Sequence, residues 1–377
     1  MSGFTSKSRW GNRPWAIDFH PSRRPIPREV DFAVVGGGFT GLSAAAWLRG
    51  MEPHKSVAIF ESGSMGAGSS GHTGGITLAE TAAGDLPGLG DVLAGFSTSL
   101  KELAVDCDLT LPGAWEVGRS GSLPDSPISW TDSGTLRAVR QVPGGTIDPG
   151  KLVSGLGRAA ERSGALIFEN SAVQDIAFEE PVRLHVAGGW VLAKAVLLAT
   201  NAMSLELSDL SRRGQPKFTL AVATEPLSSA QIEALGLASG KPFYTVDFPY
   251  LWGRLLRTGG IVFGSGLVDL SDWREFAELD VAKGEAADLI ARLEVRVRGL
   301  HPALQNVRFA HRWGGPILIA NGWRPVFSQH PRSPHAVVLG GYSGHGVALS
   351  VYLGRWAAEV LCGRRELPDW DSAEETA

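Results

Sequence analysis

The chain has 377 residues, which allows two domains of ordinary size or one large two-lobed one. Hydrophobic residues make up 44% of it and charged residues only 20%, so an intrinsically disordered chain is excluded. The net charge of −4 comes without any cluster of five or more basic residues. We therefore expect neither nucleic acid nor an anionic membrane as a partner. No apolar stretch approaches the roughly 20 residues that a membrane span requires.

The cysteines and histidines form no metal or redox pattern. Cys107 and Cys362 lie far apart, so a disulfide framework and a C-x-x-C motif are both excluded. The nine histidines show no H-E-x-x-H motif or paired spacing, and we expect no metal site. The N-terminal sequence MSGFTSKSRWGNRPW has basic residues but no apolar segment after them, so it is not typical of a secretory signal. These features predict a cytoplasmic protein.

The first part of the chain predicts one βαβ unit. Residues 1–29, rich in Pro, Arg and Trp without periodicity, are expected to form an arm that lies against the body. A buried strand at 31–35, a glycine turn, a helix over 39–49 and a strand at 57–61 follow. Such a unit closes as a parallel pair with a right-handed crossover. The Gly-, Ser- and Thr-rich residues 62–77 are predicted to be a loop.

The rest of the chain predicts a second lobe inserted into the first. Residues 78–145 are poorly periodic, whereas helices are expected over 151–162, near 280–297 and from the glycines after 340 to Cys362. Gly164 is expected to end the first of these helices. The expected strands are 165–168, 172–178, 195–199, 218–224, 261–263 and 336–339.

A glycine-rich turn joins the first predicted strand to the first helix. Gly36-Gly37-Gly38-Phe39-Thr40-Gly41 fits the pattern G-x-G-x-x-G. Gly36 allows the tight turn, Gly38 lets the backbone approach a pyrophosphate, and Gly41 allows close packing of helix on strand. The pyrophosphate would rest on the free N–H groups of the helix N-terminus. Glu61, at the end of the second strand, is placed to accept a hydrogen bond from a ribose hydroxyl. We therefore predict dinucleotide binding.

A second glycine-rich loop follows the second strand. Gly66-Ala67-Gly68-Ser69-Ser70-Gly71-His72-Thr73-Gly74-Gly75-Ile76 holds more glycines than a surface turn requires. Such backbone can approach a flat ring system closely and offer it N–H donors. With Gly36–Gly41 and Glu61, this loop resembles the flavoprotein superfamily of D-amino-acid oxidase, glycine oxidase and sarcosine oxidase. Within that superfamily its shape is most similar to the loop of gamma-glutamylputrescine oxidoreductases. The resemblance implies FAD as the cofactor.

The C-terminal glycine turn carries the same resemblance. Gly340-Gly341-Tyr342-Ser343-Gly344-His345-Gly346-Val347-Ala348-Leu349-Ser350 is similar to the family's final strand-to-helix turn, which lies beside the flavin. A helix N-terminus aimed at the N1–C2=O edge of the flavin would stabilise the anionic reduced ring. A capping serine would explain Ser343 but not four glycines around His345.

Further likenesses in the middle of the chain complete the expected cofactor site. Val173 falls where the family places a valine against adenine, Ala199-Thr200-Asn201 matches a strand-end motif near the cofactor, and His311–Pro316 resembles the segment at the dimethylbenzene side of the flavin. The implied FAD contacts are Gly36, Gly38, Phe39, Thr40, Gly41, Glu61, Ser62, Gly68, Ser69, Ser70, His72, Thr73, Gly74, Gly75, Val173, Thr200, Gly315, Gly341, Tyr342, Ser343, Gly344, His345, Gly346 and Val347.

How FAD is attached stays open at this point. His72 falls where dimethylglycine dehydrogenase has a histidine bonded to the flavin 8α-methyl group, whereas other relatives have arginine there and bind FAD non-covalently. The cysteine that holds flavin in sarcosine oxidase is absent from the His311–Pro316 segment. Both non-covalent FAD and a covalent link through His72 therefore remain possible.

The resemblance also implies an architecture. We expect an α/β, two-lobed (α+β) fold, in which a Rossmann-like FAD-binding domain carries an inserted, mainly antiparallel β-sheet substrate domain. The FAD-binding domain is expected to be discontinuous, and the arm at 1–29 belongs to neither domain. The expected bounds are 30–80, 146–210 and 332–366 for the FAD-binding domain, and 81–145 and 211–331 for the substrate domain.

Family members oxidise a C–N bond by hydride transfer to flavin N5, giving an imine that hydrolyses. The expected partners are a small amine substrate and oxygen or another electron acceptor. Sarcosine oxidase clamps the substrate carboxylate with an arginine and a lysine, but this chain has no arginine between Arg49 and Arg119 and has Ala348 in the lysine's place. The substrate is then an amine or polyamine conjugate, or an amino-acid-like molecule whose carboxylate meets another arginine. The candidates for that arginine are Arg254, Arg257, Arg312 and Arg324.

Four residues are candidates for the catalytic side of the site: Tyr250, Trp252, Arg254 and His345. Tyr250 and Trp252 can line a cage for a cationic substrate, although core packing accounts for them equally well. Arg254 falls near the lysine that promotes oxygen reaction in sarcosine oxidase. Two other functions are left open: a nicotinamide-dependent reductase built on the same βαβ unit, and a flavin-binding scaffold without turnover.

Overall fold

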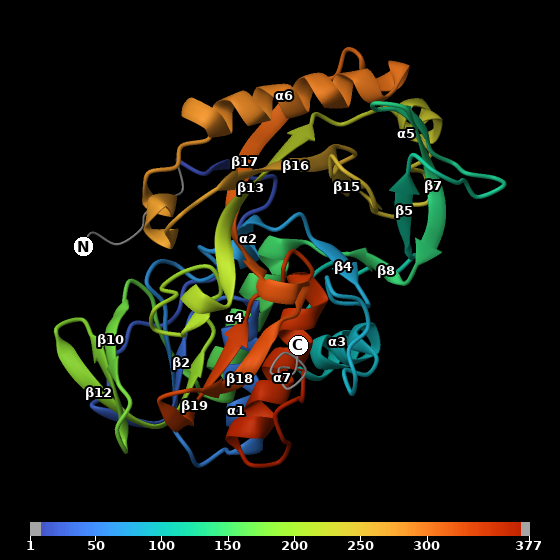
Figure 1. Ribbon diagram of the computed structural model, residues 1–377. Helices are drawn as coiled ribbons and strands as arrows, with labels where there is room; N and C mark the ends of the chain where they lie inside the picture. The colour runs from blue at the N-terminus through green and yellow to red at the C-terminus, as the bar shows by residue number, and fades with distance from the viewer. Residues whose placement is uncertain (1–8, 371–377) are drawn as a thin grey trace.

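Two large β-sheets organise the chain into two lobes, shown in a computed structural model that describes residues 9–370 (Figure 1). The sheet of the lower lobe has the order β10-β11-β12-β2-β3-β9, and β19 pairs with β12 and carries β18. The neighbours β9, β3, β2, β12 and β19 run parallel, while β10, β11 and β18 are antiparallel additions. The bounds are β2 (Glu29–Val35), β3 (Val57–Phe60), β9 (Leu166–Phe168), β10 (Val173–Ala177), β11 (Val182–Val186), β12 (Gly189–Leu198), β18 (Val326–His330) and β19 (Ser333–Gly340).

Four helices belong to the lower lobe. They are α1 (Phe39–Met51), α3 (Val92–Glu102), α4 (Pro149–Ser163) and α7 (Gly346–Leu361). All four residues of β3 are buried, as expected of a parallel strand that is covered on both faces. Helix α1 packs against both α4 and α7, and Gly354 makes this approach close, because a Cβ there would lie 2.8 Å from the carbonyl oxygen of Thr40.

The sheet of the upper lobe has nine strands in the order β1-β17-β13-β16-β15-β14-β5-β7-β6. Only the β14–β5 pair is parallel, and α6 (Gly284–Leu300) lies along the outer face with Ile290, Leu293 and Val297 buried (Figure 1). The bounds are β1 (Gly11–Asn12), β5 (Ala114–Gly118), β6 (Ser129–Thr131), β7 (Thr135–Val142), β13 (Gly214–Thr224), β14 (Phe243–Thr245), β15 (Trp252–Leu255), β16 (Ile261–Asp269) and β17 (Phe309–Ala320). The opposite face looks toward the lower lobe.

Shorter elements complete the chain. Strands β4 (Ile76–Leu78) and β8 (Gly144–Thr146) pair with each other between the lobes. The remaining helices are α2 (Ser69–His72), α5 (Ser229–Ala234) and the 3-10 turns η1 (Leu210–Arg212), η2 (Trp273–Ala277), η3 (Pro302–Leu304) and η4 (Asn321–Trp323). No helix among residues 9–370 is both long and apolar enough to cross a membrane. Within the same residues, no group of three or more His, Cys, Asp or Glu side chains is arranged to hold a metal ion.

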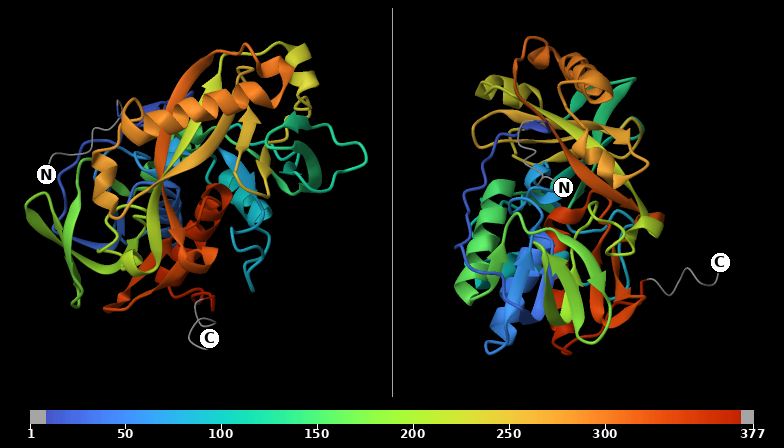
Figure 2. Two further views of the ribbon diagram at one scale, coloured as in Figure 1. Left: turned by 45° about the horizontal axis from the view of Figure 1, so that its top comes forward. Right: turned by 90° about the vertical axis from the view of Figure 1, so that its left-hand side faces the viewer.

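The N-terminal segment links the two lobes. Strand β1 pairs with β17 in the upper sheet, and the chain then runs down along α4, as the right-hand view of Figure 2 shows. Along that path the backbone N–H of Asp18 donates to the hydroxyl of Ser154 on α4 at 2.8 Å. Residues 1–8 of the predicted arm lie outside the described part of the chain.

Most expected elements are present with shifted ends. Helix α4 ends as predicted at Gly164, which has φ +98° and takes the left-handed conformation that favours glycine. The expected loop at 62–77 is wrong in part, because it contains α2 and the first residues of β4. Likewise, the expected helix near 280–297 begins later, at Gly284, and a short second helix, α5, lies in the same half of the chain.

The domain boundaries stay a prediction, and two elements bear on where they would be drawn. Helix α3 packs against α7 in the lower lobe, although residues 81–145 were assigned to the substrate domain. Strand β18 pairs with β19 in the lower sheet, although residues 211–331 are also expected to belong to the substrate domain. The packing of α3 on α7 and the pairing of β18 with β19 therefore favour a division that moves both elements to the FAD-binding domain.

Candidate active site

One cavity of about 720 Å³ lies between the lobes. On the lower side it is lined by the turns that follow β2, β3, β12 and β19, so the carboxyl ends of four parallel strands meet at it. In open α/β sheets this edge is where ligands bind. On the upper side the inner face of the nine-stranded sheet, from β17 to β5, closes the cavity.

The first glycine turn is constrained by its neighbours. Gly36 has φ +111°, and a Cβ there would lie 2.5 Å from the carbonyl oxygen of Ala199. A Cβ on Gly41 would lie 2.0 Å from the carbonyl oxygen of Gly36, so Gly41 faces the turn rather than the cavity. Helix α1 has no acidic residue in its first turn, and its N-cap residue, Gly38, has no side chain that could accept from the N–H groups there. Its N-terminus therefore presents positive potential to the cavity.

Glu61 lies on the cavity wall directly after β3. Its carboxylate accepts hydrogen bonds from the backbone N–H groups of Gly37 and Gly63, each at 2.8 Å, and from the hydroxyl of Ser62 at 3.1 Å. Burial raises the pKa of Glu61 above its ordinary value. The hydrogen bonds fix the side chain at the end of the strand, where the sequence places the acceptor for a ribose hydroxyl.

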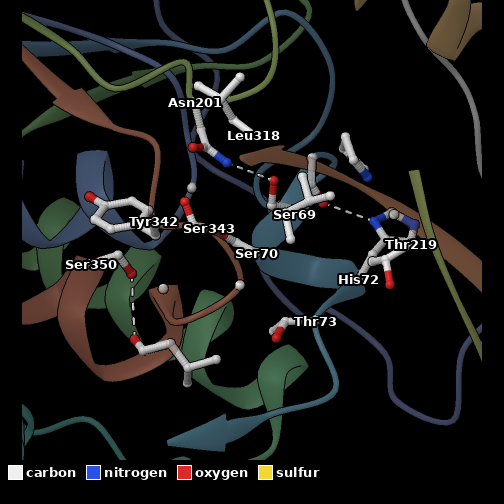
Figure 3. Close-up of a pocket in the computed structure, with 18 of the residues that line it drawn as sticks. Ser69, Ser70, His72, Thr73, Asn201, Thr219, Leu318, Tyr342, Ser343 and Ser350 are labelled. Atoms are coloured by element: carbon white, nitrogen blue, oxygen red, sulfur yellow. Dashed lines mark hydrogen bonds between the residues drawn. The ribbon is translucent and has the colours of Figure 1, made fainter. Parts of the chain in front are cut away.

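The second glycine loop is tied to the other two turns. The hydroxyl of Ser70 accepts a hydrogen bond from the backbone N–H of Phe39 at 2.9 Å. Asn201 donates to the hydroxyl of Ser69 at 3.0 Å and accepts from the backbone N–H of Gly341 at 2.9 Å (Figure 3). Asn201 thus holds together the second loop and the C-terminal turn.

The C-terminal turn presents the N-terminus of α7 to the cavity. The hydroxyl of Tyr342 makes a 2.7 Å hydrogen bond with the hydroxyl of Thr40, and the hydroxyl of Ser343 accepts from the backbone N–H of Ala320 at 3.0 Å. His345 is the N-cap residue of α7, and its Nδ1 has no hydrogen-bond partner among the described residues. Burial lowers the pKa of His345, so its imidazole is neutral near pH 7.

His72 is held on both ring nitrogens. Nδ1 lies 2.9 Å from the carbonyl oxygen of Gly68 and therefore carries the proton, while Nε2 lies 3.1 Å from a guanidinium nitrogen of Arg13 and accepts. Burial, together with the charge of Arg13, lowers the pKa of His72 to about 4. Trp10 packs edge-on against the ring. His72 is therefore a neutral side chain fixed by the N-terminal segment.

Aromatic side chains line the inner face of the upper sheet. Trp252 lies against two glycines, since a Cβ on Gly74 would be 2.1 Å from its ring and a Cβ on Gly264 would be 1.9 Å from it. Tyr250 lines the cavity too and is 40% exposed. Its carbonyl oxygen accepts hydrogen bonds from Ser265 at 2.6 Å and from Arg296 at 2.8 Å.

Four of the predicted site residues do not line the cavity: Gly41, Gly75, Gly341 and Arg254. The glycines shape the turns from behind. Arg254 is 5% exposed, donates to the carbonyl oxygen of Gly74 and lies over the ring of Trp15. Burial lowers its pKa to about 10. Arg257, Arg312 and Arg324 also lie off the cavity wall, and Arg257 and Arg312 pair with Asp108 and Glu294.

The remaining predicted residues lie together on the wall: Gly36, Gly38, Phe39, Thr40, Glu61, Ser62, Gly68, Ser69, Ser70, His72, Thr73, Gly74, Val173, Thr200, Tyr250, Trp252, Gly315, Tyr342, Ser343, Gly344, His345, Gly346 and Val347. Sequence reasoning missed Glu80, Glu116 and Tyr244, which also line the cavity. They are single polar residues in segments without a motif, and the pairing of β5, β14 and β15 is what brings Glu116 and Tyr244 near Trp252.

Comparison with known proteins identifies the family. The chain matches the family model DAO, FAD dependent oxidoreductase, over residues 31–360. The chain belongs to this family. It is 28% identical to gamma-glutamylputrescine oxidoreductase of Escherichia coli (strain K12), with 89% of this chain and 84% of that protein covered.

Solved structures of this family have the same fold. Glycine oxidase from Geobacillus kaustophilus superposes with a TM-score of 0.70 at 18% identity, covering 90% of this chain and 96% of that one. L-Proline dehydrogenase from P. horikoshii superposes with a TM-score of 0.71 at 17% identity, covering 91% and 96%. The expected fold class is confirmed, and the chain is an FAD-dependent oxidoreductase. The family match decides for FAD over the nicotinamide alternative.

The residues present fit FAD. Two helix N-termini, those of α1 and α7, open on one cavity, and neither has an acidic residue in its first turn. Both suit groups that carry negative charge, such as a pyrophosphate. Glycine at position 38 lets the two glycine loops lie close together on this wall, since a Cβ there would lie 2.8 Å from the hydroxyl of Ser70.

Proposed function

We propose that this flavoenzyme oxidises the C–N bond of a primary or secondary amine. The substrate molecule is a simple amine, a polyamine conjugate or an amino-acid-like compound. FAD, when bound, supplies the two-electron acceptor at N5. The substrate C–H bond breaks with its electron pair leaving as hydride, the nitrogen lone pair forms a C=N bond, and a secondary or primary imine remains once the N–H proton is lost. Water then adds to the imine and releases a carbonyl compound and ammonia or an amine.

One observation carries this proposal: a single cavity joins the glycine turns of the lower lobe to the aromatic face of the upper sheet. A cofactor on the turns and a small substrate under the sheet would therefore share one water-poor space. The relatives support the chemistry, because gamma-glutamylputrescine oxidoreductase, glycine oxidase and 4-methylaminobutanoate oxidase are named for amine or amino-acid substrates.

Under this proposal, different parts of the cavity wall would bind different parts of FAD. The N-terminus of α1, with the backbone of Gly38, would hold the pyrophosphate, and Glu61 would accept from the ribose. Val173 would pack against the adenine. The N-terminus of α7, at Gly344–Val347, would face the flavin end and stabilise negative charge that develops there.

The substrate side would keep the reacting amine neutral. Leu220, Ala221 and Ile317 line this part of the wall, and an amine that is desolvated by such groups has a lowered pKa. His345 lines the cavity as well, and burial lowers the pKa of its imidazole. Trp252 supplies an aromatic face beside Gly74, and Tyr250, which is 40% exposed, supplies one nearer the open end.

The test is anaerobic reduction of the purified holoprotein by a panel of amines and amino acids, followed by its absorption in the visible range. Bleaching by an amine, with formation of the matching carbonyl compound, is the expected outcome. Reoxidation by air or only by an artificial acceptor then assigns the physiological class of acceptor. A flavin that stays oxidised with every amine but bleaches with a hydroxy acid would overturn the proposal.

A further inference from the structure

A row of side chains crosses the upper sheet and ends in a carboxylate. Cross-strand pairing places Glu116 of β5 opposite Tyr244 of β14, and Tyr244 opposite Trp252 of β15. All three side chains line the cavity. Neighbouring strands lie about 4.8 Å apart, so Glu116 is roughly 10 Å from Trp252 along this row. The cavity therefore has a distinct far end, away from the glycine turns that meet Trp252.

Two carboxylates meet at that far end. The hydroxyl of Tyr244 donates to Glu116 at 2.9 Å and lies 3.5 Å from a carboxylate oxygen of Glu80. Arg140, whose side chain is 62% exposed, binds Glu116 through two 2.6 Å hydrogen bonds and does not line the cavity. Glu80 forms no ion pair with any Lys or Arg in the described part of the chain. Glu80 thus faces the cavity without an ion-pair partner of its own, although the charge of Arg140 acts on it without direct contact.

The rest of the wall fits a cationic ligand. No Lys or Arg within residues 9–370 lines the cavity, whereas Glu61, Glu80 and Glu116 do. Glu61 is already engaged by backbone N–H groups. Aromatic faces stand between the two ends, at Tyr244, Tyr250 and Trp252, and such faces attract ammonium groups. Charge and aromatic lining are independent features, and both favour the same class of ligand.

The two ends of the cavity would treat two amines differently. Near the glycine turns the wall is apolar, and desolvation there favours the neutral amine that reacts. At the far end a carboxylate favours the protonated amine, because an opposite charge stabilises the charged form. The pKa of Glu80 is raised by burial and by the charge of the neighbouring Glu116. An ammonium group bound between the two carboxylates would offset the repulsion from Glu116.

We infer that the substrate is a dication in solution: a diamine or polyamine chain whose distal ammonium group binds Glu80, Glu116 and Tyr244 while the amine roughly 10 Å away is oxidised. This inference rests on the proposed function and names its substrate class. It assigns Glu80 as a specificity residue, which contacts the substrate at a distance from the reacting atoms.

The test compares three chains of equal length on the holoprotein: diaminooctane, octylamine and aminooctanoate. Isothermal titration calorimetry on the anaerobic holoprotein, with its flavin first reduced by dithionite, gives binding without oxidation of the amine, and bleaching of the oxidised holoprotein gives turnover. We expect diaminooctane to bind roughly ten- to hundred-fold more tightly than octylamine, the range of one charge-assisted hydrogen bond, and aminooctanoate to bind most weakly. In Glu80→Gln the preference for diaminooctane over octylamine should fall toward one.

Asp85→Asn is the matched control, because Asp85 is an exposed acidic residue near Glu80 that does not line the cavity. It removes the same charge and should keep the preference. Tyr244→Phe is a second variant and should reduce it. Equal binding of diaminooctane and octylamine to the wild type, or tighter binding of aminooctanoate, overturns the inference. If diaminooctane binds preferentially but no amine bleaches the flavin, the proposed function fails while the dication site stands.

Discussion

Replacing Gly41 by alanine tests the close packing between α1 and the first glycine turn. In an open helix this change would stabilise the fold by up to roughly 1 kcal/mol, because glycine is the poorer helix former. Here the new Cβ would lie 2.0 Å from the carbonyl oxygen of Gly36 and 3.0 Å from Val34. Contact with a backbone oxygen cannot be relieved by a rotamer change, so the start of α1 must move away from β2.

The displacement should weaken FAD binding as well as stability. Overpacking of this kind costs roughly 1–3 kcal/mol, which reverses the sign expected from helix propensity. A holoprotein at a hundredfold excess of FAD over its Kd is stabilised by about 2.7 kcal/mol. If the moved helix N-terminus raises the Kd about a hundredfold, that stabilisation falls to roughly 0.4 kcal/mol at the same concentration.

Gly50→Ala is the control in the same helix, since a Cβ at Gly50 meets no atom within 4 Å. We expect Gly50→Ala to raise the Tm of the apoprotein slightly and to leave the FAD titration unchanged. Gly41→Ala should lower the Tm and increase the Kd measured by quenching of flavin fluorescence. Wild-type FAD affinity together with a raised Tm in Gly41→Ala would refute the reasoning about this turn.

Three further predictions concern His72 and Glu61. The pKa of His72 is about 4 in the folded protein, against an ordinary value of 6.5. Between these two pH values only the unfolded chain takes up a proton at His72. The free energy of unfolding should therefore fall by up to roughly 3 kcal/mol as the pH drops from 6.5 to 4. Urea unfolding at pH 7 and pH 5 should show this loss, His72→Gln should reduce it, and a change of the exposed His54 should not. Both ring nitrogens of His72 already make hydrogen bonds, so we expect FAD to be bound non-covalently. Acid precipitation should then leave a colourless pellet, and the protein in it should have the mass of the bare chain. A yellow pellet would contradict this prediction. Glu61→Gln removes a charged acceptor and should raise the Kd for FAD roughly ten- to hundred-fold in the same fluorescence titration, and unchanged affinity would exclude Glu61 from the ribose site.

The lower lobe could be predicted well because its signals are local. The first predicted strand and helix agree with β2 and α1 to within two residues at each end, since a buried parallel strand appears as an unbroken apolar run and the glycines mark the turn between them. Gly164 ends α4 for a similarly local reason. By contrast, α2 escaped prediction, because a single turn among glycines and serines has no periodicity to detect.

The upper sheet could not be assembled from the sequence, because its neighbours are far apart in the chain. Strand β1 pairs with β17 across about 300 residues, and β5 pairs on one side with nearby β7 but on the other with β14, more than 120 residues away. Tyr250 and Trp252, for which the sequence leaves a cage for a cation and core packing equally open, both lie on the cavity wall. Arg254, expected near the position of the lysine that promotes oxygen reaction in sarcosine oxidase, lies off the cavity wall, where it donates to the carbonyl oxygen of Gly74 and lies over the ring of Trp15.

The cofactor side of the cavity is formed by backbone and the substrate side by side chains. This difference explains why the sequence predicts the cofactor but not the substrate. The cofactor side consists of backbone, and close backbone approach demands glycine at fixed spacing: Gly36 and Gly41 would clash with carbonyl oxygens if they carried a Cβ. Such a requirement leaves a motif. The substrate side consists of single side chains on separate strands, so Glu80, Glu116 and Tyr244 can each be exchanged without disturbing a turn. Substrate preference can therefore change while the cofactor motif stays fixed, and the choice of amine must be determined from the cavity itself.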